Sequence, residues 1–342
     1  MSRVKKLLLF VLVLILVAAA STFYVWRGVA LPYRGFQGEQ FVTINTGASV
    51  PSIGRALVDA GVVRDARAFQ IAARLKGAEK RLQAGEYRFD RAATAFDVVE
   101  RIARGDVFVR PITFPEGRTA AEMAAIYEER GFGAAADFLK ATRDPARVRA
   151  FDPDADNLEG YLFPSTYRLP RHTTAAALVQ LMVLSFEKAL DPALRSAAAA
   201  RGMSVREAVT MASLVEEEAQ KPEERPLISA VYHNRLRIGM GLQCDATVIY
   251  ALQRAGRWNG NITKADLSMD SPYNTYTHRG LPPGPIANPG RASLQAAITP
   301  ADVPYLYYVS RNDGSHAFAS TLDEHNRNVQ QYQVQYFRDR RN

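Results

Sequence analysis

The sequence predicts an α+β protein with an N-terminal transmembrane helix, a small α+β module, and a larger, mostly helical α+β domain that contains a C-terminal β-hairpin. Three observations predict this organisation. Residues 7–26 are apolar and uncharged, strand and helix patterns alternate over residues 40–113, and helical spacing dominates residues 114–342. A length of 342 residues exceeds that of a typical single domain, so at least two folded parts are expected.

The composition excludes several classes of protein. With 47% hydrophobic and 23% charged residues, the chain is globular in composition rather than disordered or fibrous. A single cysteine, Cys244, excludes an intramolecular disulfide and any cysteine-based zinc site, and the five histidines lack metal-ligand spacing, so no metal is expected. The net charge of +8 is spread along the chain, which favours an anionic membrane surface or polymer as partner and argues against nucleic acid.

The apolar segment over residues 7–26 is long enough to cross a bilayer, because twenty helical residues at about 1.5 Å each span roughly 30 Å. Residues 1–6 include three basic side chains, and Tyr24 and Trp26 lie at the opposite end of the segment. Basic residues favour the cytoplasmic side of a membrane, and aromatic rings favour the headgroup boundary. We therefore expect residues 1–6 to form a cytoplasmic tail and the remainder of the chain to be exported.

A cleaved signal peptide is the alternative for this segment. Residues 7–17 match the apolar core of such a peptide, and the alanines at 18–20 match its cleavage site. We favour a retained anchor because the apolar run continues to Trp26. An unpaired cysteine in an oxidising compartment is expected to be buried, which predicts a core position for Cys244.

Residues 27–39 are glycine-rich and lack periodicity, which predicts a linker before the module over residues 40–113. The strands expected in this module are 41–44, 85–89 and 107–113, and the expected helices are 49–60, 66–75 and 95–103. The order of strand, turn, helix and turn in FVTINTGASVPSIGRALVDAGVV resembles a LysM-like module, a fold associated with binding of glycan chains. A spacer without a ligand is the alternative for this module.

The second domain is expected over residues 114–342. It begins at FPEGRT, where Thr119 and Glu122 have the spacing of a helix capping box. An Asp-Gly turn at residues 311–315 predicts a hairpin between strands 305–310 and 316–320, followed by a last helix over 322–337. The other expected helices are 119–130, 134–142, 174–190, 204–219, 226–237 and 246–252.

The predicted helix SVREAVTMASLVEEEA, residues 204–219, carries a carboxylate on its apolar face. At about 100° per residue, Glu216 lies within the stripe formed by Val205, Ala212 and their apolar neighbours, whereas Glu217 and Glu218 fall on the solvent side. Burial raises the pKa of a glutamate, as a general acid working near neutral pH requires. The alternative is that Glu216 forms an ion pair with a basic residue such as Arg225 or Arg235.

Two further stretches combine aromatic and polar side chains in the way that sugar binding requires, since rings stack on sugar faces while amides and hydroxyls bind sugar hydroxyl groups. The proline-rich loop over residues 271–290 provides Tyr273, Asn274, Thr275 and Tyr276. A surface loop packed on itself is the alternative. Residues 157–167 provide Glu159 and Tyr161, although a glutamate there is also typical of a hydrogen-bonded turn. Asp245, which precedes a helical run, is first of all an N-cap.

Together, the blocks LEGYLFPSTY, ASLVEEEA, VYHNRLRIGMGLQCDATVIYAL and YNTYTHRGLPPGPIANPG, with the closing hairpin and helix, resemble the endolytic murein transglycosylase (YceG-like) family. The resemblance implies a single-pass protein of the inner membrane whose catalytic domain is periplasmic. It implies peptidoglycan glycan strands and the membrane as partners, with peptidoglycan synthases as candidates, and no cofactor. The family's catalytic glutamate is the first Glu after A-S-hydrophobic-V, here Glu216. Cys244 departs from the family, which more often has a hydroxyl residue there.

The implied reaction is cleavage of the β-1,4 bond between N-acetylmuramic acid and N-acetylglucosamine within a strand, giving 1,6-anhydro ends and limiting the length of nascent strands. A single carboxylate, Glu216, suffices, because the C6 hydroxyl of the muramic sugar replaces water as the nucleophile. Two alternatives remain open at this stage. One is a hydrolytic muramidase with a second acid such as Asp245 or Glu159. The other is a membrane-tethered, non-catalytic scaffold that binds glycan.

Overall fold

The computed structural model describes residues 3–339 and divides into two compact units, one ending at Arg110 and the other beginning at Pro111. Each unit has its own hydrophobic core. The chain is a mixed α+β protein with an apolar N-terminal helix and a C-terminal hairpin, as predicted. Residues 1 and 2 of the expected cytoplasmic tail lie outside the described part of the chain.

Helix α1 (Arg3–Ala30) contains an apolar stretch, Leu7–Ala30, that is long enough to cross a membrane. Its most apolar 18 residues have a mean hydropathy of 2.7, and none of these 18 is buried in the protein. The helix continues four residues beyond the expected end at Trp26. It does so because Gly28 brings its backbone against Ala68 and Val29 enters the core of the first unit.

The linker expected over residues 27–39 is helical as far as Ala30, and its remaining residues contact the rest of the first unit. After α1 ends, Tyr33 forms an antiparallel bridge with Ala93, and the Gly35 N–H donates to the Gly61 carbonyl at 2.8 Å. A Cβ at Gly61 would lie 2.8 Å from the Gly35 backbone, so these two segments approach closely only because both residues are glycine. The residues after Ala30 lack periodicity because their backbone pairs with other segments of the first unit, and not because they form a flexible linker.

The first unit contains two antiparallel strands and three helices in addition to α1. The strands are β1 (Gln40–Ile44) and β2 (Gly85–Phe89), paired from Gln40 opposite Phe89 to Ile44 opposite Gly85. The helices are α2 (Val50–Asp59), α3 (Ala66–Leu75) and α4 (Ala95–Arg104). Side chains at the preceding residues cap all three helices, which explains why the expected boundaries are so close to the observed ones.

The strand expected over residues 107–113 does not close the first unit. Val107 and Phe108 lie against β2, where the Phe108 N–H donates to the Glu86 carbonyl. Strand β3 (Arg110–Thr113) instead pairs with β4 (Thr166–Leu169), which the sequence analysis missed. The sequence pattern of residues 107–113 does not reveal this change of partner strand, which the tertiary fold determines.

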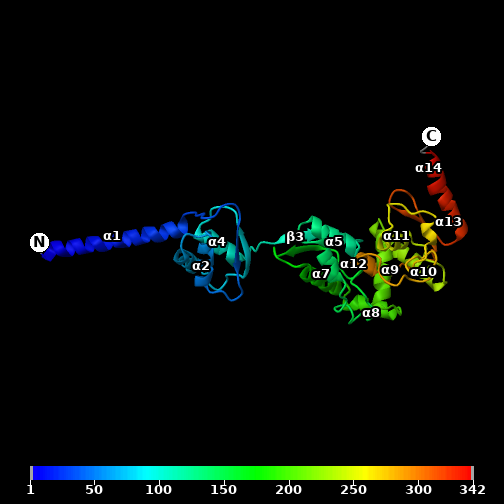
Figure 1. Ribbon diagram of the computed structural model, residues 1–342, viewed down its shortest axis with the longest axis horizontal. Coiled ribbons are helices and arrows are strands. Elements are labelled where there is room, and N and C mark those ends of the chain that lie inside the picture. Colours follow the sequence, from blue (N-terminus) through cyan, green and yellow to red (C-terminus); the bar gives the residue numbers. More distant parts are fainter. Residues whose placement is uncertain (1–2, 340–342) are drawn as a thin grey trace. The chain divides into compact units, whose positions relative to one another are not determined.

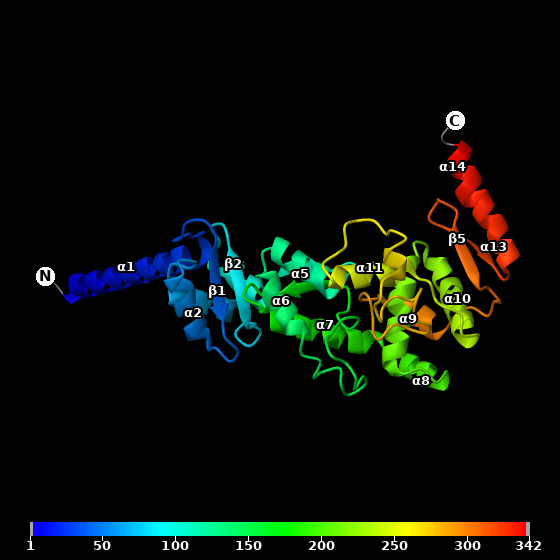
Figure 2. The same ribbon diagram turned by 45° about the vertical axis from the view of Figure 1, so that its right-hand side comes forward.

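The second unit is mostly helical (Figure 1). Its helices include α5 (Ala120–Glu129), α6 (Ala135–Thr142), α7 (Ala175–Ala189), α8 (Pro192–Ala200), α9 (Val205–Glu218), α10 (Arg225–Arg237), α11 (Asp245–Arg254) and α12 (Arg291–Ile298). The sequence analysis predicted these except α8 and α12. Figure 2, a turned view of the same ribbon, shows α9 among α8, α10 and α11. Helix α9 also packs on α12.

The C-terminal hairpin consists of β5 (Tyr307–Ser310) and β6 (His316–Ala319), which pair as predicted. The closing helix begins at Leu322 and includes one π-helical segment, Gln330–Gln335, between α13 (Leu322–Val329) and α14 (Tyr336–Asp339). Asn312, at the turn of the hairpin, has a positive φ of 65° and donates to the Tyr332 carbonyl. The hairpin turn is thereby bound to the closing helix.

Candidate active site

Helix α9 holds the carboxylate that the sequence analysis singled out. Ser204 and Glu207 form a capping box at its start, and the helix ends at Glu218 because Ala219 is extended and Pro222 follows. The eight residues Ala208–Val215 are all buried, so other segments of the protein pack against this part of the helix on every side. The apolar stripe predicted from periodicity is therefore only part of the buried surface, because small polar residues such as Ser213 are buried as well.

Glu216 has partners at both carboxylate oxygens. Its Oε2 accepts a hydrogen bond from the Gly290 N–H at 2.9 Å, and its Oε1 lies 3.2 Å from Nη2 of Arg225. The side chain is only 5% exposed. Arg225 is in turn held by a hydrogen bond from its Nε to Ser293 Oγ at 3.0 Å. The ion pair considered as an alternative from the sequence is thus present with Arg225.

Arg235, the other basic residue considered, is not a partner of Glu216. It is buried, and its guanidinium donates to the carbonyl oxygens of Leu306 and Leu242. These bonds connect α10 with the start of the hairpin and with the segment before α11. Arg235 is therefore part of the scaffold of the second unit.

The structure brings a second carboxylate, that of Glu116, to the same arginine. Glu116 Oε2 lies 3.8 Å from Arg225 Nη2, and the side chain is 49% exposed. Partial burial and repulsion by Glu216 raise the pKa of Glu116, whereas Arg225 opposes this shift. A Cβ at Gly290 would lie 1.9 Å from Glu116 Oε1, so the absence of a side chain at position 290 makes room for this carboxylate.

Sequence reasoning missed Glu116 because FPEGRT was interpreted only as the start of a domain. The glycine that follows Glu116 carried a usable signal. Gly117 has a φ of +76°, and a Cβ there would lie 2.9 Å from Glu217 Oε1 and 3.7 Å from Glu216 Cγ. The Glu-Gly pair therefore marks a turn that passes directly over the end of α9.

The two glutamates after Glu216 differ in environment. Glu217 is exposed, as expected, yet loss of surrounding water and repulsion by Glu122 and Glu216 raise its pKa to about 7. Glu218 was expected on the solvent side, and that prediction is wrong. It is half-buried and accepts a hydrogen bond from Cys244 Sγ at 3.3 Å, and burial raises its pKa. The helical angle was correct, but another layer of the fold covers that face.

Asn288 joins three segments beneath the site. Its side chain is fully buried; Nδ2 donates to the Arg118 carbonyl and to Glu159 Oε1, both at 2.8 Å, and Oδ1 accepts from the Leu162 N–H at 2.9 Å. Its backbone pairs with Gly117 and Arg118. This one amide therefore fixes the turn that carries Glu116 against the loop that carries Gly290.

Two of the predicted substrate contacts lie in this scaffold. Glu159 accepts hydrogen bonds from the Ala120 N–H, Asn288 and Tyr250, and burial raises its pKa to about 7. Tyr161 is 1% exposed and its hydroxyl donates to Asp152. Both side chains are engaged by the protein itself, and a sugar contact for either stays a prediction.

The other predicted contacts lie around the proline-rich loop and α11. Asn274 and Thr275 are buried and bind backbone groups of their own neighbourhood, including the Met269 carbonyl and the Cys244 N–H. Tyr273 is half-buried, with its ring 5.0 Å from that of Tyr250. Only part of the loop therefore offers aromatic surface to a ligand.

Asp245 and Tyr276 form a pair at the surface of α11. Asp245 is exposed and accepts a hydrogen bond from the Tyr276 hydroxyl. It is the first residue of α11, whereas the N-cap is Cys244, whose side chain caps nothing. The expectation of an N-cap at Asp245 is thus wrong by one residue, because the Asp245 side chain bonds to the tyrosine instead of the helix.

The chemistry available at the site comes from carboxyl groups. Glu116 and Glu216 meet beside Arg225, and Glu217 follows on α9. The groups that surround Glu216 come from three segments: the turn before α5, the start of α10 and the loop before α12. In the part of the chain that the structure describes, no group of three or more His, Cys, Asp or Glu side chains is arranged to hold a metal ion. Such a site is able to give and take protons.

A family profile described as the YceG-like family matches residues 42–331 of the sequence. The chain belongs to the YceG-like family. Two relatives that match most of the chain agree with this membership. An endolytic murein transglycosylase of Bacillus subtilis (strain 168) is 33% identical to this YceG-like chain over 85% of the chain and 84% of that protein. An endolytic murein transglycosylase of Streptococcus pneumoniae serotype 2 (strain D39) is 29% identical over 97% of this chain, which spans 66% of that protein's length.

A solved structure is also similar to this YceG-like chain. The crystal structure of the yceG-like protein lmo1499 from Listeria monocytogenes matches with a TM-score of 0.58 and 32% sequence identity, over 85% of this chain and 99% of that one. The similarity therefore extends over most of both chains rather than over one unit alone.

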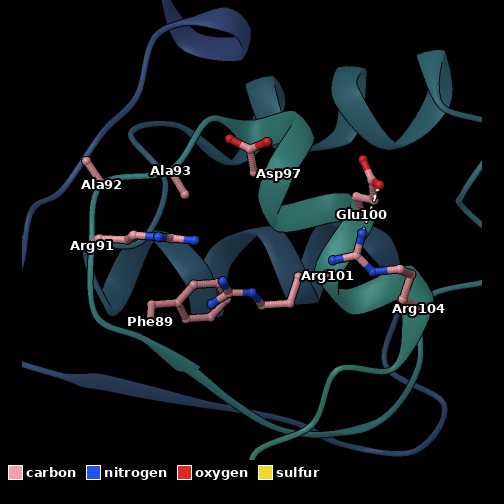
Figure 3. Close-up of a pocket in the computed structure, with 8 residues that line it drawn as sticks. All are labelled: Phe89, Arg91, Ala92, Ala93, Asp97, Glu100, Arg101 and Arg104. Carbon is pink, nitrogen blue, oxygen red and sulfur yellow. Dashed lines mark hydrogen bonds and ion pairs between the residues drawn. The ribbon is translucent and has the colours of Figure 1, made fainter.

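The first unit has a separate hollow of about 380 Å³ between β2 and α4. Figure 3 shows Arg91 and Arg101 pointing into it from opposite walls, with the Phe89 ring beneath Arg101. Arg104 at its edge is neutralised by Glu100 and Asp106. The hollow therefore offers guanidinium donors, whereas the Phe89 ring is buried in the core and covered by Arg101.

Proposed function

We propose that this chain is a membrane-anchored lyase that cuts peptidoglycan glycan strands internally, with Glu216 as the catalytic residue. Two relatives over most of the chain are named endolytic murein transglycosylases, which supports this activity. The observation that carries the assignment to Glu216 is its nearly complete burial at the end of α9, where both oxygens have polar partners.

In the proposed reaction, Glu216 protonates the oxygen that leaves C1 of N-acetylmuramic acid, and the glycosidic bond breaks. Arg225 neutralises the carboxylate that remains, from 3.2 Å. That carboxylate then removes the proton of the C6 hydroxyl, whose oxygen bonds to C1. The product is a 1,6-anhydro sugar, Glu216 is protonated again, and no water is consumed.

The layout of the chain forms part of the proposal. Helix α1 anchors the protein in the inner membrane with its N-terminus in the cytoplasm and the second unit, the catalytic domain, in the periplasm. Cutting close to the membrane would limit the length of nascent strands and bring the enzyme near peptidoglycan synthases. The uncharged stretch over residues 7–26 and the basic residues that precede it support this orientation.

The first unit is proposed to be a LysM-like glycan-binding module. The order β1, α2, α3, β2 with antiparallel strands supports this assignment. The hollow with Arg91 and Arg101 in its wall offers guanidinium donors for the hydroxyl or carboxyl groups of a glycan (Figure 3). A protein that begins near Phe114 should bind isolated glycan strands more weakly than the whole chain if the module contributes.

The test of the catalytic assignment is Glu216→Gln, which keeps the size of the side chain and removes its proton chemistry. Release of soluble fragments from peptidoglycan by this variant should fall to background, while Glu223→Gln, an exposed glutamate nearby, retains wild-type rates. Digestion at the wild-type rate by Glu216→Gln would refute the assignment of catalysis to Glu216, whereas no digestion by the wild-type protein would leave the scaffold as the better assignment. Unchanged urea unfolding of the variant ensures that folding is not the cause.

A further inference from the structure

The first unit has exposed apolar surface directly beside the end of α1. Leu75, on α3, is 70% exposed. Together with Ile71 and Phe96 it lines a hollow of about 430 Å³ whose other wall is α1, from Ser21 to Ala30. The lining is almost entirely apolar: its remaining members are Thr22, Val25, Trp26 and Val29.

The position of this hollow along α1 sets its depth in a membrane. The uncharged segment from Leu7 to Trp26 is roughly 30 Å long, which equals the thickness of the hydrocarbon layer. Leu7 and Trp26 must therefore lie near the two edges of that layer. Ser21 lies five residues before Trp26, or about 7 Å deeper along the helix axis. The hollow with Ser21 in its wall therefore extends below the level at which α1 leaves the hydrocarbon.

A cationic hollow lies on the other side of the contact between α1 and α3. It has a volume of about 400 Å³ and shares Val25 and Ile71 with the apolar one. Arg27, Arg64 and Arg67 line it. The one acid in its wall, Asp65, already accepts hydrogen bonds from Tyr24 and the Arg67 N–H, and within the described residues no carboxylate forms an ion pair with these arginines.

The residues of helix α3 fit the boundary between the acyl chains and the phosphates of a membrane. Its buried face, Ala68, Phe69, Ala72 and Ala73, packs into the core of the first unit. A second stripe at four-residue spacing carries Arg67, Ile71 and Leu75. A stripe that passes from a cation to two apolar side chains matches a lipid surface, where phosphates lie outside and acyl chains lie inside.

We propose that the first unit rests on the outer surface of the membrane, with Ile71, Leu75 and Phe96 among the acyl chains and Arg27, Arg64 and Arg67 on anionic lipid phosphates. This contact rests on the proposed anchoring by α1. It would fix the orientation of the first unit relative to the bilayer, which a helix alone, free to rotate about its axis, does not do. The occupant of the apolar hollow is phospholipid.

The experiment uses the full chain in vesicles that contain a third of phosphatidylglycerol, with one fluorophore at Leu75→Cys or at Val107→Cys. Val107 is the matched control, since it is an exposed apolar residue of the same unit and lines a hollow without any α1 residue. Native Cys244 is buried and stays unlabelled under native conditions. Lipids that carry a nitroxide near the headgroup quench contacts with the membrane, and iodide quenches contacts with water.

We expect lipid nitroxide to quench the probe at 75 several-fold more than the probe at 107, and iodide to show the opposite order. Replacing Arg64 and Arg67 by Gln, or phosphatidylglycerol by a zwitterionic lipid, should weaken lipid quenching at 75. Equal iodide quenching at both positions in vesicle-bound protein would overturn the contact. Shielding of position 75 by added glycan strands but not by lipid would assign the surface to glycan instead.

Flotation with the vesicles separates this inference from the anchoring on which it rests. Protein that floats but shows a water-exposed probe at 75 contradicts the lipid contact alone. Protein that fails to float contradicts the anchor, and with it the contact.

Discussion

Replacing Asn288 by alanine tests how the site is held together. The change removes three hydrogen bonds of a fully buried side chain. The Leu162 N–H, itself in a buried residue, loses its acceptor, and an unsatisfied buried group costs about 1–3 kcal/mol. The Arg118 carbonyl and Glu159 each lose one of several donors, worth about 1 kcal/mol apiece. The free energy of unfolding should therefore fall by about 3–5 kcal/mol.

That loss is large beside the usual domain stability of about 5–15 kcal/mol. Tryptophan fluorescence during urea unfolding measures it cleanly in a protein that lacks residues 1–26, because Trp258 is then the sole tryptophan and lies in the second unit. Asn326→Ala, at an exposed position of α13, is the control and should change stability by less than about 0.5 kcal/mol. A decrease below about 1 kcal/mol for Asn288→Ala would refute the reasoning.

Three further predictions follow from buried or crowded groups. Burial raises the pKa of Glu159 from 4.5 to about 7, so the native state binds a proton more tightly than the unfolded state does, and the free energy of unfolding should fall as the pH rises from 4.5 through 7. Glu159→Gln should flatten this decline, measured as the urea midpoint at each pH. An unchanged slope in the variant would contradict the prediction. Cys244 should resist N-ethylmaleimide in native protein and react fully in urea, as mass spectrometry would show; rapid native labelling would contradict its burial. Gly290→Ala should displace the flexible, half-exposed Glu116 side chain and lower the free energy of unfolding by less than about 1 kcal/mol. The displacement should alter the pH profile of glycan cleavage. An unaltered profile would show that Glu116 has no part in the reaction.

The sequence predicted the elements whose signals are local. Capping residues such as Thr94, Thr119 and Ser204 define helix starts, and the alternation around the Asp-Gly turn defines the hairpin. Helix α8, which begins at Pro192, was missed because its alanine run has no apolar stripe, and α12 because it follows a loop rich in proline and glycine.

The candidate site was predictable only in part. Periodicity placed Glu216 in an apolar environment because that property belongs to one helix. Of its partners, Arg225 was one of two candidates from the sequence, whereas Gly290 and Glu116 lie on segments that no local pattern brings to Glu216. The partner of β3, and the layer that covers Glu218, are determined by tertiary packing in the same way.

The central claim is that Glu216 transfers a proton so that the sugar's own hydroxyl replaces water. Mass spectrometry of the fragments released from purified glycan strands tests this most directly, because a 1,6-anhydro end is lighter by one water than a reducing end. The account predicts anhydro ends within the strands for the wild-type protein and none for Glu216→Gln. Reducing ends from the wild-type protein would contradict it.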